Sequence, residues 1–332
     1  MTAWEYAEQI LRIDLSQRQA RVEATSIQLK RSFVGGAGFV TRLLTGGTPG
    51  RVALAAGPLS DGMAGRLSLG AAPGAGGRPA LSSLGGRMAG ALKSSGYDAV
   101  LIEGELDRPG VLMVEPDGVR LLDGAELWGL EVPAAERMLA GFAGPSWATM
   151  LLGPAAENGV AFATLAHEGH FAGGSGVAAA LGAKRLKAVL VQDSAGTPSR
   201  CTGCTLVCPG KMSCAAQRAG DLGLDAPTAE RMAALAEACA QAGILPQMSE
   251  PFLEMAHRTG VGQLLALGEA AVISHLGPAA GRMLAALPPP RKHRGVGVAD
   301  LLGTCQRIWR ERPGQVLREA LTATQGLLAS AV

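Results

Sequence analysis

Three of the six cysteines lie within one short run. Cys201, Cys204 and Cys208 follow a C-x2-C-x3-C spacing, and a proline comes directly after the third cysteine. A short loop can aim the first two thiolates, and one helical turn can bring the third to the same side, so the three can hold one cubane cluster. Structural zinc usually takes two C-x2-C pairs, and the sequence has no second pair. The run therefore favours a 4Fe-4S cluster over zinc, with three buried apolar cysteines as the weakest alternative.

A fourth thiolate would come from one of the remaining cysteines, Cys214, Cys239 or Cys305. Cys239 shares the apolar side of a predicted helix with Met232 and Leu235, which is typical of a buried, unreactive cysteine. The spacing by itself leaves Cys214 and Cys305 as alternatives.

Glycine loops are the second feature with chemical meaning. The 47 glycines cluster, as at positions 35–36 and 85–86, and clustered glycine lets the backbone approach a ligand, although ordinary turns explain some of these pairs. The segment from Gly174 to Ala179 fits a G-x-G-x-x-A dinucleotide pattern, and Asp193 lies about 20 residues on. In a dinucleotide site an apolar strand directly precedes this pattern, but here residues 167–172 lie between the two. The sequence therefore disfavours a nicotinamide site at this position.

One short polar segment could bind a metal. His167-Glu168-Gly169-His170 offers two imidazoles and a carboxylate to a divalent ion. A glycine-containing loop with solvated histidines is the commoner outcome for such a segment, and we expect it here. The sequence contains neither a nucleophile elbow nor a P-loop.

Hydrophobic periodicity predicts a strand-rich first half and a helical second half. The expected strands are Ile10–Leu15, Arg21–Ala24, Val52–Ala56, Ala99–Glu103, Val111–Val114, Thr149–Leu152, Val160–Leu165 and Ala188–Val191. The expected helices are Ser32–Leu44, Gly86–Ser95, Ala134–Ala140, Gly176–Leu181, Thr228–Ala242, Pro251–Arg258 and Val261–Leu276. A polar, Pro- and Gly-containing linker at 193–200 divides the chain into a first domain at 1–195 and a second at 201–332.

The composition excludes several functions. The formal net charge is +2 and aromatic residues make up 4% of the chain, so neither steering by charge nor stacking platforms support nucleic-acid binding. No apolar run reaches the roughly 18 residues that a membrane helix needs. Acidic residues near the N-terminus stand where a secretory signal would carry basic ones, so we expect a soluble, cytoplasmic protein with no membrane partner.

An ordered series of short motifs resembles the aldehyde ferredoxin oxidoreductase family of tungsten–pterin enzymes. The motifs cover nearly the whole first half and scattered parts of the second, and their order and separation match the family. They are Phe33–Gly38, Gly57–Leu59, Ala64–Arg66, Ser83–Gly86, Gly96–Ala99, Ile102–Gly104, Leu127–Gly129, Gly153–Asn158, Ala179–Ala188, Asp221–Asp225 and Asp300–Cys305.

This resemblance implies a fold, two cofactors and a set of site residues. The fold would be α+β, with a β-rich N-terminal domain of two sheets forming a saddle for a bis-pterin tungsten or molybdenum centre, followed by a smaller helical region. The family pattern makes Cys305 the fourth cluster ligand and leaves Cys214 as a spare. It also places Arg66 between pterin and cluster. The remaining implied pterin-binding residues are Ser83, Gly85, Gly86, Asp225, Asp300 and Gly303.

The resemblance further implies oxidation of an aldehyde-type substrate with electron transfer to ferredoxin, within a homodimer or a larger redox complex. The sequence departs from the family at several points. Family members are nearly twice as long, and the carboxylate and histidine that handle protons near the metal cannot be located here, so no catalytic residue is assigned. A non-catalytic iron–sulfur relay or assembly subunit is therefore one alternative, and a nicotinamide oxidoreductase with structural zinc is another.

Overall fold

The computed structural model describes residues 6–58, 60, 66–73, 79–197 and 214–289 of the 332-residue chain. Twelve strands of this described part form two six-stranded sheets. The first sheet has the order β2 (Gln19–Ala24), β1 (Gln9–Asp14), β6 (Ala99–Glu103), β3 (Val52–Ala55), β4 (Leu67–Ala71) and β5 (Ala80–Leu84). The second has the order β11 (His170–Gly173), β10 (Thr164–His167), β9 (Trp147–Leu152), β12 (Leu186–Gln192), β7 (Gly110–Glu115) and β8 (Gly118–Asp123).

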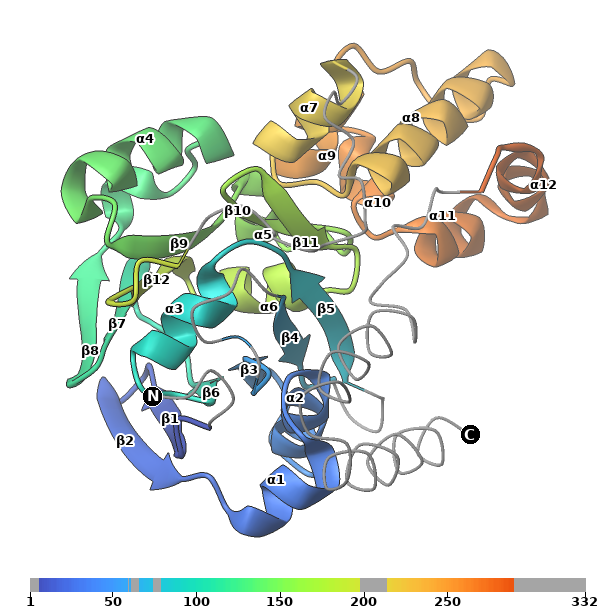
Figure 1. Cartoon of the computed structure of the whole chain (residues 1–332). Coiled ribbons are helices and arrows are strands. Elements are labelled where there is room, and N and C mark those ends of the chain that lie inside the picture. The colour runs from blue at the N-terminus through green and yellow to red at the C-terminus, as the bar shows by residue number, and fades with distance from the viewer. Residues whose placement is uncertain (1–5, 59, 61–65, 74–78, 198–213, 290–332) are drawn as a thin grey trace.

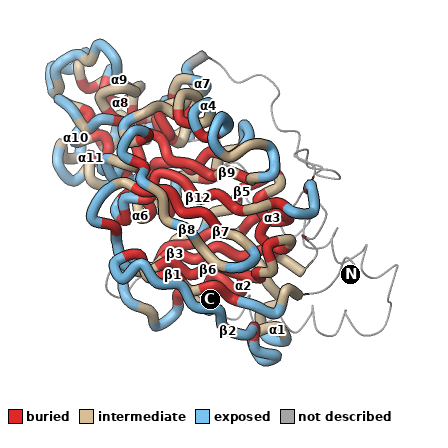
Figure 2. The backbone as a smooth tube through the Cα atoms, turned by 90° about the vertical axis from the view of Figure 1, so that its left-hand side faces the viewer, coloured by how far each residue is buried: buried red, intermediate tan, exposed pale blue. Residues whose placement is uncertain are grey.

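Both sheets are mixed. In the first sheet β1 pairs with β6 in parallel and the other neighbours are antiparallel, and in the second sheet only the β12–β7 pair is parallel. Side chains alternate between the two faces of each strand, so each central strand contributes to two cores. Val52 and Leu54 of β3, for example, belong to the core between the sheets, whereas Ala53 and Ala55 face outward against a helix. Figure 2 shows these strands as the buried centre of the molecule.

Helices cover the outer faces and fill the space between the sheets (Figure 1). Helix α2 (Ala37–Leu44) packs its buried Phe39, Val40 and Leu44 on the outside of the first sheet, and α4 (Val132–Ala143) covers the outside of the second. Helix α6 (Val177–Ala183) contacts strands of both sheets, and α3 (Met88–Ser94) contacts β9 and β12. The remaining elements of this half are α1 (Ile27–Phe33), α5 (Pro154–Glu157) and the 3-10 turn η1 (Ala125–Leu127).

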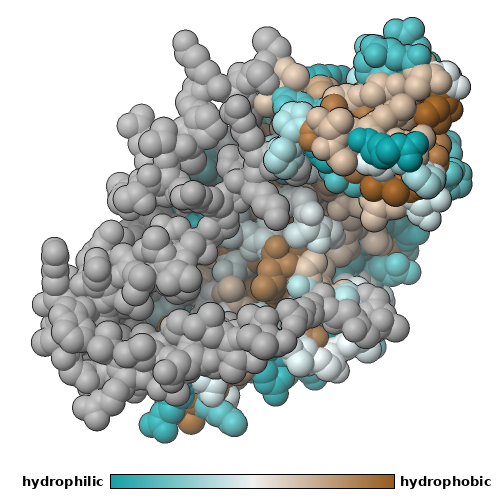
Figure 3. Space-filling model, turned by 90° about the vertical axis from the view of Figure 1, so that its right-hand side faces the viewer, coloured by the Kyte–Doolittle hydropathy of each residue, from teal (hydrophilic) through white to brown (hydrophobic). Residues whose placement is uncertain are grey.

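A smaller helical region follows and packs on the segment between β9 and β10. Backbone hydrogen bonds join the two parts, because the amides of Ala155 and Thr164 donate to the carbonyls of Leu222 and Gly223 at 3.0 and 2.7 Å. The six helices of this region are α7 (Cys214–Asp221), α8 (Ala226–Gln241), α9 (Pro251–His257), α10 (Gly262–Leu265), α11 (Glu269–Leu276) and α12 (Pro278–Ala286). Its described surface mixes hydrophilic and hydrophobic side chains on the face seen in Figure 3.

The predicted α+β class, with two sheets and a smaller helical region, is confirmed. The prediction missed β4, β5, β8 and β11, because these strands are short, glycine- or serine-containing or partly exposed and lack a long apolar run.

The expected single helix from 32 to 44 is two helices, since the backbone takes positive φ at Val34, Gly35 and Gly36. The strand expected at 160–165 begins only at Thr164, and the helix expected at 261–276 is divided into α10 and α11. The division into domains at 1–195 and 201–332 stays a prediction.

Within the described residues no helix is both long and apolar enough to cross a membrane.

A buried ion pair ties three separate segments together. Lys187 on β12 and Glu157 at the end of α5 form a salt bridge whose side chains are 0% and 3% exposed. The Lys187 ammonium also donates to the carbonyl of Leu130 at 2.8 Å, and Glu157 accepts from the amide of Gly129 at 2.7 Å. Burial raises the pKa of Glu157 and lowers the pKa of Lys187, while the pairing of the two opposes both shifts. The pair holds its charges because each has further hydrogen bonds.

We expect Lys187→Met to lower the free energy of unfolding by about 3–5 kcal/mol, because it leaves the Glu157 carboxylate buried without its cation. Urea denaturation followed by circular dichroism measures this change. Arg18→Met is the matched control: the Arg18–Asp107 pair has side chains 52% and 75% exposed, so its loss should change the free energy of unfolding far less. Equal, small losses in both variants would show that the buried pair does not stabilise the fold.

Candidate functional site

The candidate site lies where the two sheets meet. Strand β5 is one edge of the first sheet and β11 is one edge of the second, and these two edge strands contact each other. Arg66 comes directly before β4, Ser83 lies on β5, and Gly85 and Gly86 follow β5. The structure therefore brings four of the predicted pterin-binding residues to one place.

Arg66 is held on the edge strand by two hydrogen bonds. Its Nε donates to the hydroxyl of Ser83 at 2.6 Å, and its Nη2 donates to the carbonyl of the same residue at 3.1 Å. The side chain is half-buried, and Nη1 makes no hydrogen bond within the described chain. The guanidinium is thus a fixed positive charge with donor capacity left over, which is what recognition of an anion requires.

A second glycine loop lies beside this arginine. Ser68 of β4 is the cross-strand partner of Ser83, so their side chains leave the same face of the sheet. A Cβ placed on Gly36 would lie 3.2 Å from the hydroxyl of Ser68, and one on Gly35 would lie 3.0 Å from a carbon of Pro58. The loop at 35–36 therefore comes close to β4, which follows directly after Arg66 and pairs with the strand of Ser83.

Gly85 and Gly86 are required by two imidazole rings. Gly86 has φ +96°, and a Cβ there would lie 2.6 Å from Cδ2 and 2.8 Å from Nε2 of His167. A Cβ on Gly85 would lie 3.0 Å from Nδ1 of His170. No side chain fits at Gly86 without displacing the His167 ring, because real Cβ contacts below 3 Å essentially do not occur, and one at Gly85 would require the His170 ring to shift by a few tenths of an ångström. The two glycines thus have a packing role, beside which pterin binding stays a prediction.

The two histidines come from one tight hairpin. His167 ends β10, His170 begins β11, and the two are cross-strand partners. The intervening Glu168 and Gly169 both have positive φ, 47° and 76°, as a two-residue type I′ turn requires. The expectation of a loop with solvated histidines is wrong for His167, which is 0% exposed, because the hairpin folds its last β10 side chain toward Gly86.

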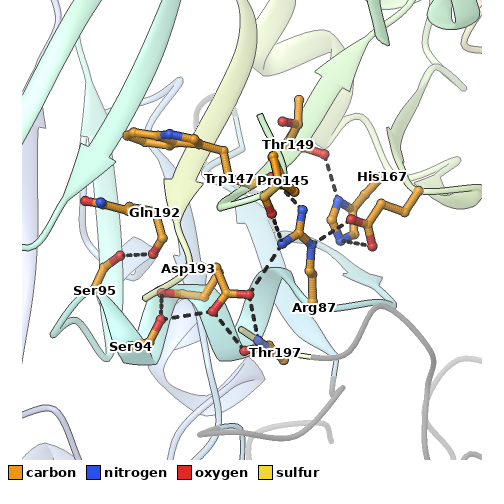
Figure 4. Close-up of polar contacts among 12 residues, drawn as sticks. Arg87, Ser94, Ser95, Pro145, Trp147, Thr149, His167, Gln192, Asp193 and Thr197 are labelled. Carbon is orange, nitrogen blue, oxygen red and sulfur yellow. Dashed lines mark hydrogen bonds and ion pairs between the residues drawn. The ribbon is translucent and has the colours of Figure 1, made fainter. Parts of the chain in front are cut away.

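Arg87 fixes this hairpin to the rest of the site (Figure 4). Its Nε donates to Glu168 at 2.7 Å, while Nη1 and Nη2 donate to the carbonyls of Pro145 and Trp147 at 2.8 and 2.7 Å. The guanidinium therefore connects the start of α3, the start of β9 and the turn of the hairpin. Sequence reasoning missed Arg87, since its partners lie 58 to 81 residues away.

The structure removes the geometric basis for a dinucleotide site at Gly174–Ala179. Strands β11 and β12 are not neighbours, because β10 and β9 lie between them, so the segment joins no βαβ unit. Asp193, which would hold a ribose, is buried and accepts instead from the amide of Thr197 at 2.8 Å and from its hydroxyl at 3.1 Å. The chain's own loop uses this carboxylate.

Asp225 lies near the other end of the same hairpin. It caps α8 by accepting from the amide of Thr228 at 3.3 Å and from the Thr228 hydroxyl at 2.5 Å. A Cβ on Gly174, the residue after β11, would lie 3.6 Å from the Asp225 carboxyl carbon. At about 3.3 Å per strand residue, His170 and Gly174 are roughly 13 Å apart. Asp225 and the Arg66 group, which is Arg66, Ser83, Gly85 and Gly86, therefore lie toward opposite ends of β11.

The other predicted site residues fall outside the described part of the chain. These are the cluster ligands Cys201, Cys204, Cys208 and Cys305 and the pterin residues Asp300 and Gly303, all of which stay predictions. Cys239, expected in the core, is buried there with its sulfur 3.8 Å from that of Met283. Its burial raises the pKa of the thiol, as for an inert core cysteine.

Comparison with known proteins places the chain in a family. A family model described as the N-terminal domain of aldehyde ferredoxin oxidoreductase matches residues 10–193, more than half of the chain. A tungsten-containing aldehyde ferredoxin oxidoreductase of Thermococcus kodakarensis is 30% identical over 202 residues, which are 57% of this chain and 33% of that protein. The corresponding protein of Pyrococcus horikoshii is 32% identical over 201 residues, 56% of this chain and 33% of that protein.

Two further similarities are weaker in sequence. A Pyrococcus furiosus protein named as the WOR-like subunit of an aliphatic sulfonate oxidoreductase is 25% identical over 224 residues, covering 59% of this chain and 36% of that protein. A solved structure, the active site complex BamBC of benzoyl coenzyme A reductase with 1,5-dienoyl-CoA, has a TM-score of 0.72 and 19% identity. It covers 84% of this chain and 64% of that chain, and this likeness shows the fold alone.

The match therefore covers the two sheets and every described residue of the Arg66 group, while the chain spans about a third of the length of the curated relatives it matches. On the strength of the family model and the ordered motifs within it, the chain belongs to the aldehyde ferredoxin oxidoreductase family.

Proposed function

We propose that this chain forms the pterin-binding part of a tungsten or molybdenum bis-pterin oxidoreductase with one 4Fe-4S cluster. The relatives named as tungsten-containing enzymes support the metal, and the family model supports the pterin fold. The proposal includes oxidation of an aldehyde-type substrate and electron transfer to ferredoxin. When bound, the metal would supply the two-electron chemistry, and the cluster would pass the electrons on one at a time.

The observation that carries the proposal is the Arg66 guanidinium, which Ser83 holds beside the glycine loop at 85–86 and whose Nη1 has no partner among the described residues. Among the described residues, Nε2 of His167 and the hydroxyls of Thr164 and Ser175 are buried and make no hydrogen bond. Such groups are rare, because each costs about 1–3 kcal/mol if nothing satisfies it. His167 adjoins Gly86, whereas Thr164, three residues earlier on β10, leaves the opposite face of that strand, so one pterin does not reach all three atoms.

The proposed pterin-binding residues would contact different parts of the cofactor. Arg66 would hold an anionic group through the free face of its guanidinium, and Ser83 would keep that guanidinium in place. Gly85 and Gly86 would let the ligand approach the backbone. Asp225 would accept from ring N–H groups beside Gly174. Asp300 and Gly303 are proposed as pterin-binding from their motif.

The four thiolates proposed for the cluster are Cys201, Cys204, Cys208 and Cys305, with Cys214 as a spare. We propose no catalytic acid or base, because the carboxylate and histidine expected from the family are not identified in this sequence. A relative named as a subunit supports a larger redox complex, and a homodimer is the alternative assembly. The second candidate function is a non-catalytic iron–sulfur relay subunit, which the missing proton-handling residues favour.

Cys204→Ser should remove the brown iron–sulfur absorbance and most of the bound iron from anaerobically purified protein, because it removes the central one of the three neighbouring thiolates proposed to hold the cluster. Iron analysis and the visible spectrum measure the effect. Cys239→Ala is the control, since that thiol lies in the helical core and should leave iron content unchanged. Undiminished iron and absorbance in Cys204→Ser reject the cluster assignment.

Arg66→Met should weaken pterin retention by about 10- to 100-fold, the effect of losing one charge-assisted anion contact. Tungsten, molybdenum and released pterin are measured per protein chain after extensive dialysis. Arg108→Met, an exposed arginine paired with Asp123, controls for loss of positive charge. Wild-type protein that holds iron but neither metal nor pterin would instead establish the relay subunit.

A further inference from the structure

Strand β2 is an open edge of the first sheet. Within the described residues it pairs with β1 alone, and five of its six residues are exposed. It contains no proline, no lysine and no bulge, which are the features that commonly keep an exposed edge from pairing with another chain. Figure 2 faces this side of the molecule and shows β2 at the rim, below the buried strands β1 and β6.

The backbone of β2 presents every second residue to the open edge. The amide of Thr25 donates to the carbonyl of Glu8 at 2.8 Å, and the amide of Leu15 donates to the carbonyl of Glu103 at 3.0 Å. Because bonded and non-bonded pairs alternate along an antiparallel ladder, even-numbered residues of β1 bond to β2 and odd-numbered ones bond to β6. The β2 residues opposite these odd-numbered ones therefore direct their N–H and C=O groups to the open edge. They are Ala20, Val22 and Ala24.

The side chains of β2 separate by charge between the two faces of the sheet. Val22 lies opposite Leu11, a residue of the core between the sheets, but is itself 51% exposed. Arg21 and Glu23 leave the other face, where they form an ion pair at 3.4 Å. The edge thus has no charge on its inner face, and its outer face carries two opposite charges that are two residues apart.

This strand is complementary to a second copy of itself. In an antiparallel pairing about a twofold axis, the bonded residues of both copies must face the open edge. When Val22 lies opposite its own counterpart, every outward-facing residue is paired, and Arg21 of each copy lies opposite Glu23 of the other. Centring the pairing on Arg21 or Glu23 would place like charges opposite each other, and centring it on either alanine would pair fewer residues.

The open edge of the second sheet lacks this complementarity. Strand β8 has β7 as its one neighbour in the described part of the chain, and its charged residues are Arg120 and Asp123. These two are three positions apart, so they leave opposite faces and cannot lie opposite each other between two copies. Arg120 is also bound by Glu115 of β7 at 2.6–3.1 Å. Of these two open edges, β2 is therefore the one that fits a second copy.

We propose that the open edge of β2 is an interface between two copies of this chain. The two strands pair antiparallel about Val22 and join the first sheets of both copies into one continuous sheet. The pairing uses one edge of each copy, so it gives a dimer and nothing larger. A six-residue strand covers little area, and we expect a weak dimer with a dissociation constant of about 1–100 µM. This interface is independent of the cofactors and the reaction proposed above.

Charge reversal tests the register by sedimentation velocity of the full-length chain. Arg21→Glu places glutamates opposite each other at both outer positions and should raise the dissociation constant about 10-fold or more. Glu23→Arg should have the same effect, because it places arginines there. An equimolar mixture of the two variants restores opposite charges at both positions and should dimerise nearly as well as the wild type. Arg137→Glu, at an exposed position of α4, is the control with the same change of charge and should leave the dissociation constant unchanged.

An Arg21→Glu variant that dimerises as tightly as the wild type overturns the proposal, as does a mixture of folded variants that stays monomeric. Circular dichroism establishes that each variant is folded.

Amide hydrogen exchange of the wild type needs no variant to fold. At protein concentrations well above the dissociation constant, the amides of Ala20, Val22 and Ala24 should exchange several-fold more slowly than below it, because each then donates to the second copy. The amides of Arg21 and Glu23 already bond to β1 and should change little. A chain that stays monomeric up to about 1 mM, an assembly larger than a dimer, or a dimer without this alternating protection overturns the proposal.

Discussion

Everything in the described site depends on the close approach of two sheet edges that are not hydrogen-bonded into one sheet. Strand β5 ends in two glycines, and the imidazoles of the β10–β11 hairpin occupy the space that side chains would have taken there. A methyl group at Gly86 would meet the His167 ring at 2.6 Å, so this approach is possible with glycine alone. The same contact brings the strand of Ser83, to which Arg66 is bound, against the hairpin that carries His167 and His170.

Many of the family-like motifs turn out to stabilise this arrangement. Gly129, Glu157 and Lys187 belong to three separate motifs and meet in one buried ion pair. Asp98, in another motif, pairs with buried Lys93 and also accepts from the amides of Ala7 and Glu8 at 2.9 and 3.0 Å. Breaking such pairs leaves a buried charge uncompensated, which makes these segments intolerant of change for reasons of folding and not of chemistry. Arg66, in contrast, has an Nη1 without a hydrogen-bond partner among the described residues.

The α+β class and the central strands could be predicted because runs such as β3 and β6 are continuously apolar, which burial on both faces of a sheet demands. The family motifs name both Arg66 and Ser83 as pterin-binding residues, and in the structure the two side chains are joined by a hydrogen bond. The edge strands β5 and β11 could not be predicted, since their polar and glycine-rich sequences carry no such signal. The burial of His167 could not be predicted for the same reason, because the sequence Glu168-Gly169 suits a solvated loop as well as the hairpin turn that it forms.

What the sequence by itself determined is chemical identity: the cysteine spacing, the glycine loops and the order of motifs that mark the family, all of which are local in the chain. What only the tertiary structure decided is which groups are satisfied and which are not. The Asp193 carboxylate accepts hydrogen bonds from Thr197, whereas Nε2 of His167 has no partner among the described residues. Neither fact can be predicted from the positions of these residues in the sequence. Hydrogen-bond satisfaction depends on distances between segments far apart in sequence, and those distances exist only after the sheets have packed.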